Sequence, residues 1–178
     1  TKEEFEAMKS DIKHCLSIGC EGVVVGMLMP NGQIDVERTS ELVSVAGTME
    51  VTFHRAFDRV EDSNESLEKV ILIGCKRILT SGLHKSAIEG KLLLKQLVEQ
   101  AAGRIEIMLG SGVRATNIRE LADATGARAF HSSARRQLAS KMLYNNPKMA
   151  EELRHASLDP EEVKKLKEQL DQYFNNRA

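Results

Sequence analysis

The sequence contains few aromatic residues and no excess of charge of either sign, and both shortages exclude classes of function. Its 178 residues include two Tyr, five Phe and no Trp, which is too few for a surface that stacks nucleic-acid bases. Lys and Arg number 25 against 26 Asp and Glu, so bulk charge attracts neither nucleic acid nor a membrane surface. The longest apolar runs are of strand length, too short to span a bilayer. We therefore expect neither nucleic acid nor membrane as a partner.

Cysteine is also scarce, and the three that occur form no C-x-x-C pair: they are Cys15, Cys20 and Cys75. An odd, sparse set fits a reducing compartment better than a disulfide framework, so we expect a cytoplasmic location, with the nucleus as an alternative. Two of the cysteines follow a glycine that ends a helical pattern and the third lies on a helix stripe, so structural roles are expected for all three. The chain begins at Thr1 without an initiator Met, and removal of an upstream portion is one explanation that we expect for this.

One pattern organises most of the chain: an amphipathic stretch ends in glycine, and a short apolar run follows. The pattern occurs five times, at intervals of roughly 27 residues, with Gly19, Gly47, Gly74, Gly103 and Gly126 as the glycines. Glycine supplies the left-handed conformation that often follows the last turn of a helix. The apolar runs barely alternate, as expected for strands buried on both faces. The sequence therefore predicts βα units on a parallel sheet.

Five units leave a closed barrel and an open doubly wound sheet as alternatives. A (βα)₈ barrel needs about 250 residues, and this chain supplies five strands. We expect one domain over residues 1–178, with βα repeats in 1–136 and a loop followed by a C-terminal helix in 137–178. Asp159 is predicted to cap that helix, with Pro160 at its first position.

Ionisable side chains gather where the predicted strands end, which in such sheets is the edge that binds ligands. The densest group lies in "VTFHRAFD", residues 51–58. Because side chains alternate along a strand, Thr52 and His54 point inward if their neighbours pack on helices. His54 is then a proton shuttle or a metal ligand, or a hydrogen-bonded histidine that orders its loop.

The residues near His54 also have both a functional and a structural interpretation. Arg55 could bind an anion, and Asp58 could orient His54 or ligate a metal, but an Arg–Asp pair that braces the loop is an equally good interpretation. Alternation along "RAFH" places His131 inward too, with the same alternatives as His54. His84 lies among polar residues and is expected to be solvated.

Two later loops together predict a phosphate site. In "GSGVRATN", Gly110 and Gly112 allow the backbone to approach a ligand closely, and free N–H groups before the following helix could hold phosphate. "HSSARR" follows the next strand. The side chains that could add bonds are Ser111, Arg114, Ser132 and Ser133. Tight turns with a solvated arginine are the alternative.

The motifs "TFHRAFD", "RILTSG", "IMLGSGV" and "FHSSAR" resemble those of the CutC family of copper homeostasis proteins, and the first is very specific to it. The likeness covers residues 1 to about 145 closely and the tail more loosely. It implies a TIM-type barrel in the cytosol, often homo-oligomeric and linked to copper binding or tolerance, without an established reaction. It assigns the five strands to barrel positions 4 to 8, so the chain is expected to be a partial barrel without its first three βα units.

The resemblance also implies a site, residue by residue. It would comprise Thr52, His54, Arg55, Asp58, Thr80, Ser81, Gly82, Gly110, Gly112, His131 and Ser133. Family cysteines proposed for copper lie on the missing early strands, and some members carry Cys where this chain has Ser132. Met27 and Met29 are the thioethers at the ligand end, so His54, His131 and Met27 remain the metal candidates. Because no two cysteines share that end, the sequence predicts weak Cu(I) binding.

Two functions follow, and a third interpretation stands beside them. The first is a copper-binding protein of intracellular copper homeostasis. The second is an enzyme acting on a small phosphorylated or carboxylated ligand, with His54 and Asp58 as catalytic candidates and Arg55 and Arg114 as anion ligands. Enzymatic activity is left open, and the resemblance implies none. In the third, this form binds no ligand and acts through its exposed sheet edge and tail.

Overall fold

A parallel β-sheet is the centre of the molecule. In a computed structural model, residues 1–150 and 152–176 are described. The strands are β1 (Gly22–Val25), β2 (Glu50–Phe53), β3 (Arg77–Thr80), β4 (Glu106–Leu109) and β5 (Ala129–Phe130). They lie side by side in the order of the sequence, and each pairs in parallel with the next. The predicted βα repeat on a parallel sheet is therefore confirmed.

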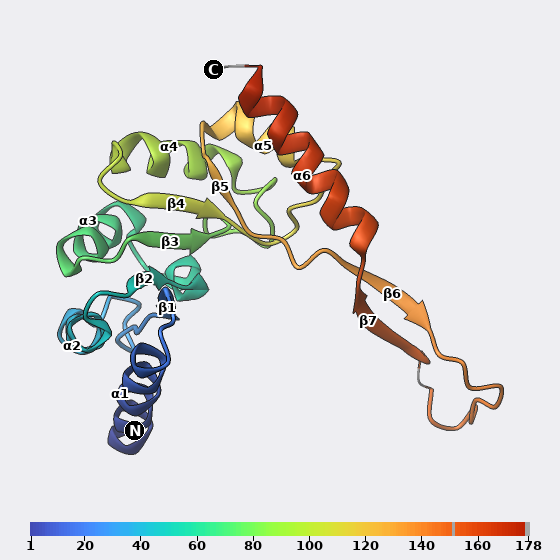
Figure 1. The fold of residues 1–178 in the computed structure, drawn as a ribbon, viewed down its shortest axis with the longest axis horizontal. Helices are drawn as coiled ribbons and strands as arrows, with labels where there is room; N and C mark the ends of the chain where they lie inside the picture. The colour runs from blue at the N-terminus through green and yellow to red at the C-terminus, as the bar shows by residue number, and fades with distance from the viewer. Residues whose placement is uncertain (151, 177–178) are drawn as a thin grey trace.

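Within the described residues, six α-helices accompany the sheet. They are α1 (Lys2–Ser17), α2 (Val36–Ala46), α3 (Ser63–Ile73), α4 (Lys91–Ala101), α5 (Ile118–Thr125) and α6 (Pro160–Asn175), with a 3₁₀ turn, η1 (Arg55–Arg59), after β2. Helices α2 to α5 follow one another around the outer side of the curved sheet (Figure 1). The glycines of the repeat, Gly19, Gly47, Gly74, Gly103 and Gly126, all have positive φ, as predicted.

The hydrophobic core lies between the sheet and these helices. Phe53, Ile78 and Leu109 project from adjacent strands and are fully buried, as are Leu67 and Leu94 on the covering helices. Each such side chain contributes about 1.5–3 kcal/mol on burial. Packing on one face of the sheet therefore fixes which residues face the other side.

The opposite face of the sheet is polar at the amino ends of its strands. Arg77 on β3 forms ion pairs with Glu50 on β2, at 2.7 Å, and with Glu106 on β4, at 2.6 Å. Val24 on β1 is in register with Thr52 on β2, and Thr52 is in register with Arg77. Val24 is 60% exposed to solvent. The two ion pairs of Arg77 tie β2, β3 and β4 together on this face of the sheet.

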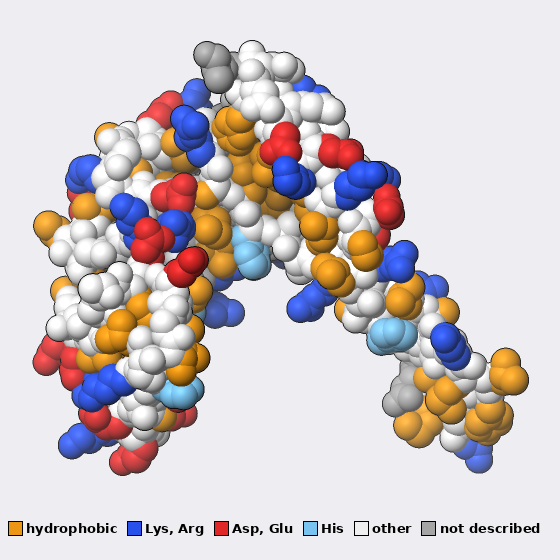
Figure 2. Space-filling view, viewed as in Figure 1, with side chains coloured by type: hydrophobic (Ala, Val, Ile, Leu, Met, Phe, Trp, Pro, Cys, Tyr) orange, Lys and Arg blue, Asp and Glu red, His pale blue; other side chains and the backbone are white. Residues whose placement is uncertain are grey.

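The tail differs from the prediction. The segment expected to be loop contains an antiparallel ribbon of β6 (Arg135–Ala139) and β7 (Arg154–Leu158), which projects away from the body (Figure 1). Most of its side chains are exposed on both faces, so the sequence lacks the apolar alternation that marks a half-buried strand. Hydrophobic side chains gather at its tip (Figure 2), where Met142, Leu143 and Tyr144 are exposed.

The C-terminal helix is confirmed as predicted. The Asp159 side chain accepts a hydrogen bond from the amide of Glu161, and Pro160 occupies the first turn. Helix α6 packs on α5, and its Leu166 is buried. Across residues 1–150 and 152–176, no helix combines the length and apolar character needed to cross a membrane.

Within the described residues β1 and β5 are the two edges of the sheet, and an edge strand presents unpaired backbone groups that can pair with another chain. We predict that the chain associates through the β1 edge and that Val24→Lys suppresses this association, since lysine on an edge strand opposes pairing. Size-exclusion chromatography with light scattering should show a smaller apparent mass for the variant at equal concentration.

Leu72→Lys is the matched control for this experiment, because Leu72 is 85% exposed on α3 and lies on no strand. It removes a comparable apolar surface and should leave the mass unchanged. Equal masses for Val24→Lys and the wild type, with strong amide protection in β1, would contradict an open edge there.

Candidate functional site

The carboxyl ends of β2 to β5 surround two adjoining cavities. The first, of about 620 Å³, is lined by His54, Arg55, Ala56, Asp58, Arg59, Leu79, Leu83, His84 and Lys85. The second, of about 250 Å³, is lined by Arg55, Leu79, Ser111, Gly112, Val113, Arg114, His131, Ser132 and Ser133. Arg55 and Leu79 belong to both. The two cavities therefore form one composite site, which we call the ligand end.

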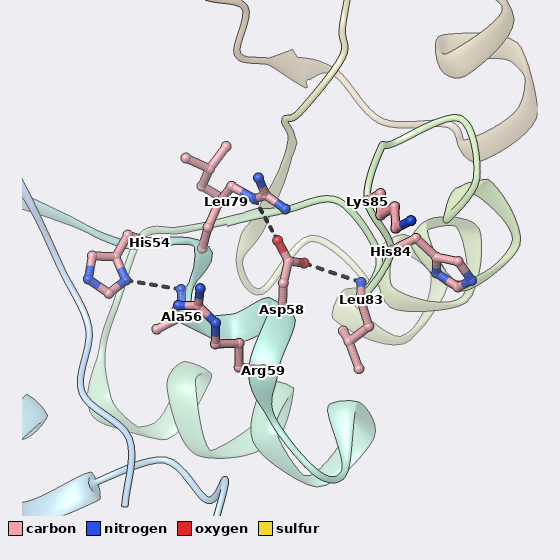
Figure 3. Close-up of a pocket in the computed structure, with 9 residues that line it drawn as sticks. His54, Ala56, Asp58, Arg59, Leu79, Leu83, His84 and Lys85 are labelled. Atoms are coloured by element: carbon pink, nitrogen blue, oxygen red, sulfur yellow. Dashed lines mark hydrogen bonds and ion pairs between the residues drawn. The ribbon is translucent and has the colours of Figure 1, made fainter. Parts of the chain in front are cut away.

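Asp58 connects the η1 turn to the loop that follows β3 (Figure 3). Its carboxylate is 8% exposed. Oδ1 accepts hydrogen bonds from Thr80 Oγ1 at 2.6 Å and from the amides of Ser81 and Leu83 at 2.9 and 3.2 Å. Oδ2 accepts from Arg55 Nε at 2.7 Å. One carboxylate thus fixes the end of β3, the following turn and the arginine that both cavities share.

The ionisation of Asp58 follows from these contacts. Burial alone would raise the pKa of the carboxyl group, but the hydrogen bonds from Thr80, Arg55, Ser81 and Leu83 together outweigh it, and the pKa is lowered. Hydrogen bonds to the charged form favour that form. Asp58 is therefore a carboxylate at neutral pH and not a proton donor.

Arg55 is oriented on two sides. Besides Nε on Asp58, its Nη2 donates to Ser81 Oγ at 2.8 Å. The side chain is 44% exposed, and none of the hydrogen bonds among the described residues uses Nη1. The bracing Arg–Asp pair considered from the sequence is therefore present, and it leaves part of the guanidinium directed to the cavities.

His54 is half-buried at the rim of the first cavity, and its ring orders the loop. Nδ1 accepts a hydrogen bond from the amide of Ala56 at 3.2 Å, so in the neutral ring the proton lies on Nε2. The contacts of Asp58 go to other groups, and the prediction that Asp58 orients His54 is wrong because the short η1 turn places the carboxylate toward β3. His84 is exposed, as expected, with Nδ1 at 2.6 Å from the Gly82 carbonyl.

The second cavity brings together the two loops that the sequence assigned to a phosphate site. Ser111 and Gly112 have φ values of 71° and 74°, so the backbone has positive φ at two successive residues of this turn. Among the described residues, no hydrogen bond uses the amides of Gly112, Val113 or Ser133. Such a concave set of amides is an anion-binding arrangement.

The amides closer to α5 are already used. Arg114 donates its amide to Asn117 Oδ1, and Ala115 donates to Glu162 Oε1 of α6, both at 2.9 Å. The predicted phosphate contact through the start of this helix is therefore occupied by a side-chain carboxylate. Sequence analysis missed Glu162 because nothing in the tail indicates that it reaches this loop.

Other predicted site residues line neither cavity: Thr52, Thr80, Ser81, Gly82, Gly110 and Met27. Thr80 and Gly82 act through the loop, since Gly82 donates its amide to Thr80 Oγ1. A Cβ at Gly110 would lie 2.6 Å from Leu79 Cδ1, so glycine there makes room for a side chain of the shared wall. Conversely, Arg59 and Lys85 line the first cavity but were not predicted as site residues. They directly follow "HRAFD" and "SGLH" in the sequence, and this position could have identified them.

The metal candidates are not brought together. His54 lines the first cavity, His131 the second, and Met27 neither. Within the part of the chain that the structure describes, no group of three or more His, Cys, Asp or Glu side chains could hold a metal ion. The side chains of Arg55, Arg59, Lys85 and Arg114 among the lining residues give the ligand end cationic, hydrogen-bonding groups.

Comparison with known proteins adds the family relationship. A model of the CutC family matches residues 1–136. A family protein CutC of Chromobacterium violaceum is 52% identical over 141 residues, which cover 79% of this chain and 57% of that protein. One of Xylella fastidiosa is 47% identical over 147 residues, covering 83% and 55%. The chain thus spans a little over half the length of these curated relatives.

Solved structures agree with the fold. A structure from Streptococcus agalactiae, named as a copper homeostasis protein CutC, superposes with a TM-score of 0.71 at 32% identity, covering 74% of this chain and 64% of that one. A structure named KDPGal superposes with a TM-score of 0.58 at 15% identity, covering 94% and 66%, which is a likeness of fold alone. The TIM-barrel type of βα repeat is thereby supported.

Asp58 generates a prediction about stability. We expect Asp58→Asn to lower the free energy of unfolding by about 2–4 kcal/mol at neutral pH, because it removes a buried charge that satisfies several donors. Because folding lowers the pKa of Asp58, its contribution is present above the unfolded pKa of about 3.9 and is lost as pH falls through the folded pKa. Urea unfolding at several pH values should therefore show the gap between variant and wild type closing in acid.

The matched control is Asp62→Asn, because Asp62 caps α3 through its side chain and asparagine caps about as well. That variant should stay within about 0.5 kcal/mol of the wild type. If Asp58→Asn were equally harmless at neutral pH, the carboxylate would not hold the loops together.

Proposed function

The chain belongs to the CutC family, and from this premise we propose that it acts in copper homeostasis and that its ligand end binds a small anionic molecule. The copper role is what the name of the Streptococcus agalactiae relative states for that protein. The anion is supported chiefly by one observation: Arg55, held by Asp58 and Ser81, is shared by both cavities. A pre-oriented guanidinium suits carboxylate or phosphate oxygens.

The charge of the first cavity supports the same ligand class. Arg55, Arg59 and Lys85 line it together with two histidines, against Asp58 as the one carboxylate among the lining residues. All the acceptor bonds of Asp58 described above go to protein donors, so this carboxylate is not free to bind a metal cation. The net field inside the cavity attracts anions.

The second cavity supplies the other half of an anion site. Its amides at Gly112, Val113 and Ser133 and its side chain of Arg114 line a concave surface. Backbone N–H groups of this kind stabilise phosphate or carboxylate without a counter-charge. A ligand that carries an anionic group at one end and a polar group at the other would fill both cavities, with Arg55 between them.

His54 favours an enzymatic role as a second candidate. Its Nδ1 is occupied by the Ala56 amide, which leaves Nε2 as the atom that could exchange a proton with a ligand. The ring lines the same cavity as Arg55, and an acid or base must lie within hydrogen-bond reach of the proton it moves. In such an enzyme, His54 transfers a proton to or from the ligand while Arg55 binds the anionic group of the ligand.

Copper itself does not fit the ligand end. Cu(I) prefers thiolate and thioether ligands, and neither cavity is lined by a cysteine or a methionine. Of the histidines that the sequence proposed as metal ligands, His54 lines the first cavity and His131 the second. We therefore place the copper-related chemistry of this chain elsewhere in the molecule.

We predict that inorganic phosphate and small phosphate esters raise the melting temperature of the protein, because a ligand that binds only the folded form stabilises it. Arg55→Ala and Arg114→Ala should each weaken the effect, and Arg55→Lys should restore it only in part because the planar fork is lost. Differential scanning fluorimetry across a ligand panel measures this directly, with His54→Gln included to separate binding from proton transfer.

Arg119→Ala serves as the control, since Arg119 is exposed on α5 and lines neither cavity. Its stabilisation by phosphate should equal that of the wild type. If no phosphate or carboxylate in the panel raised the melting temperature of the wild type, the anion site would be overturned. If Arg119→Ala lost as much of the ligand-induced stabilisation as Arg55→Ala and Arg114→Ala, the effect would be due to the overall charge of the protein and not to a specific site.

A further inference from the structure

The end of α1 brings two cysteines together. The amide of Cys20 donates to the carbonyl of Cys15 at 3.0 Å, and the amide of Gly19 donates to that of Leu16 at 3.2 Å. This pair of bonds, with φ of 78° at Gly19, defines a Schellman motif. That motif is frequently accompanied by a side-chain contact between its first and last residues, and here both of them are cysteines.

The surroundings of the pair leave it accessible. Both cysteines are half-buried and packed against the core, while the neighbouring Ile18 is 64% exposed. Burial, and after it the adjacent Cys20 thiol, raises the pKa of Cys15. Cys75, in contrast, is 5% exposed, and burial raises its pKa to about 11.

We propose that Cys15 and Cys20 form a two-thiolate site for Cu(I). Cu(I) has a closed d shell and is satisfied by two soft sulfur ligands in a linear arrangement, which a pair of thiolates supplies. On binding, each thiol loses its proton to solvent, two S–Cu bonds form, and no electron is transferred. The choice of Cu(I) rests on the copper role proposed above, whereas the thiol pair rests on geometry alone.

The same geometry disfavours the other metals that cysteine binds. Structural Zn²⁺ takes four protein ligands, and no third His, Cys, Asp or Glu completes a cluster here within residues 1–150 and 152–176. A harder ion would need oxygen ligands that the pair does not offer. Selectivity thus follows from the number and softness of the ligands.

This site changes the basis of the expectation of weak Cu(I) binding. That expectation was based on the absence of a cysteine pair at the ligand end, and no cysteine lines either cavity there. The pair instead lies before β1, at the amino ends of the strands. Sequence analysis missed it because C-x₄-C matches no metal-binding spacing by itself, and the informative residue is Gly19 between the two.

The test is a competition for Cu(I) between the reduced, anaerobic protein and a colorimetric Cu(I) chelator. We expect the wild type to withhold one equivalent. Cys15→Ser and Cys20→Ser should each weaken binding more than about tenfold, since even outer-shell changes at metal sites cost that much. X-ray absorption should report two sulfur neighbours, and Cys20→Met, which keeps a soft sulfur, should bind better than Cys20→Ser.

The controls separate this site from a structural effect and from the anion site. Cys75→Ala removes the remaining cysteine and should bind Cu(I) as the wild type does, while urea unfolding without metal checks that every variant folds. Stabilisation by phosphate should be unchanged in the Cys15 and Cys20 variants, so failure of one site does not imply failure of the other. Cu(I) binding that survives Cys15→Ser and Cys20→Ser, or Zn²⁺ binding as tight as Cu(I), would overturn the proposal.

Discussion

The parallel pairing of strands in sequence order is the constraint on which the rest of the molecule depends. Since all five strands run the same way, every carboxyl end lies on one side of the sheet and every amino end on the other. His54, Ser81, Gly110 and His131 immediately follow four different strands and therefore meet around one composite site. The turns that carry Cys20 and Cys75 lie on the opposite side for the same reason. One backbone constraint thus creates two chemically different ends.

At the ligand end, a single carboxylate organises the rest. Asp58 was a catalytic candidate beside His54, yet its carboxylate oxygens accept hydrogen bonds from Thr80, Ser81, Leu83 and Arg55. Its role is to position the guanidinium, which would otherwise be a flexible surface side chain. A site built this way binds with less loss of conformational freedom, because its cation is already oriented.

What the sequence could predict depended on the range of the interaction. The βα period, the helix caps at Asp62 and Asp159 and the meeting of the two glycine- and serine-rich loops follow from local pattern plus the rule for parallel sheets, and the structure contains them. The ribbon of β6 and β7 was missed because it is exposed on both faces and has no apolar period. The contact between Glu162 and the Ala115 amide was missed because it joins segments 47 residues apart whose packing no motif encodes.

The thiol pair was missed for a different reason, and that reason bears on its chemistry. Its signal is conformational, since only the left-handed turn at Gly19 folds Cys20 back onto Cys15. The pair also lies at the C-terminal end of a helix, where the backbone carbonyls concentrate negative charge. That field favours a bound cation. A helix end of this polarity is therefore a better place for Cu(I) than the cationic ligand end.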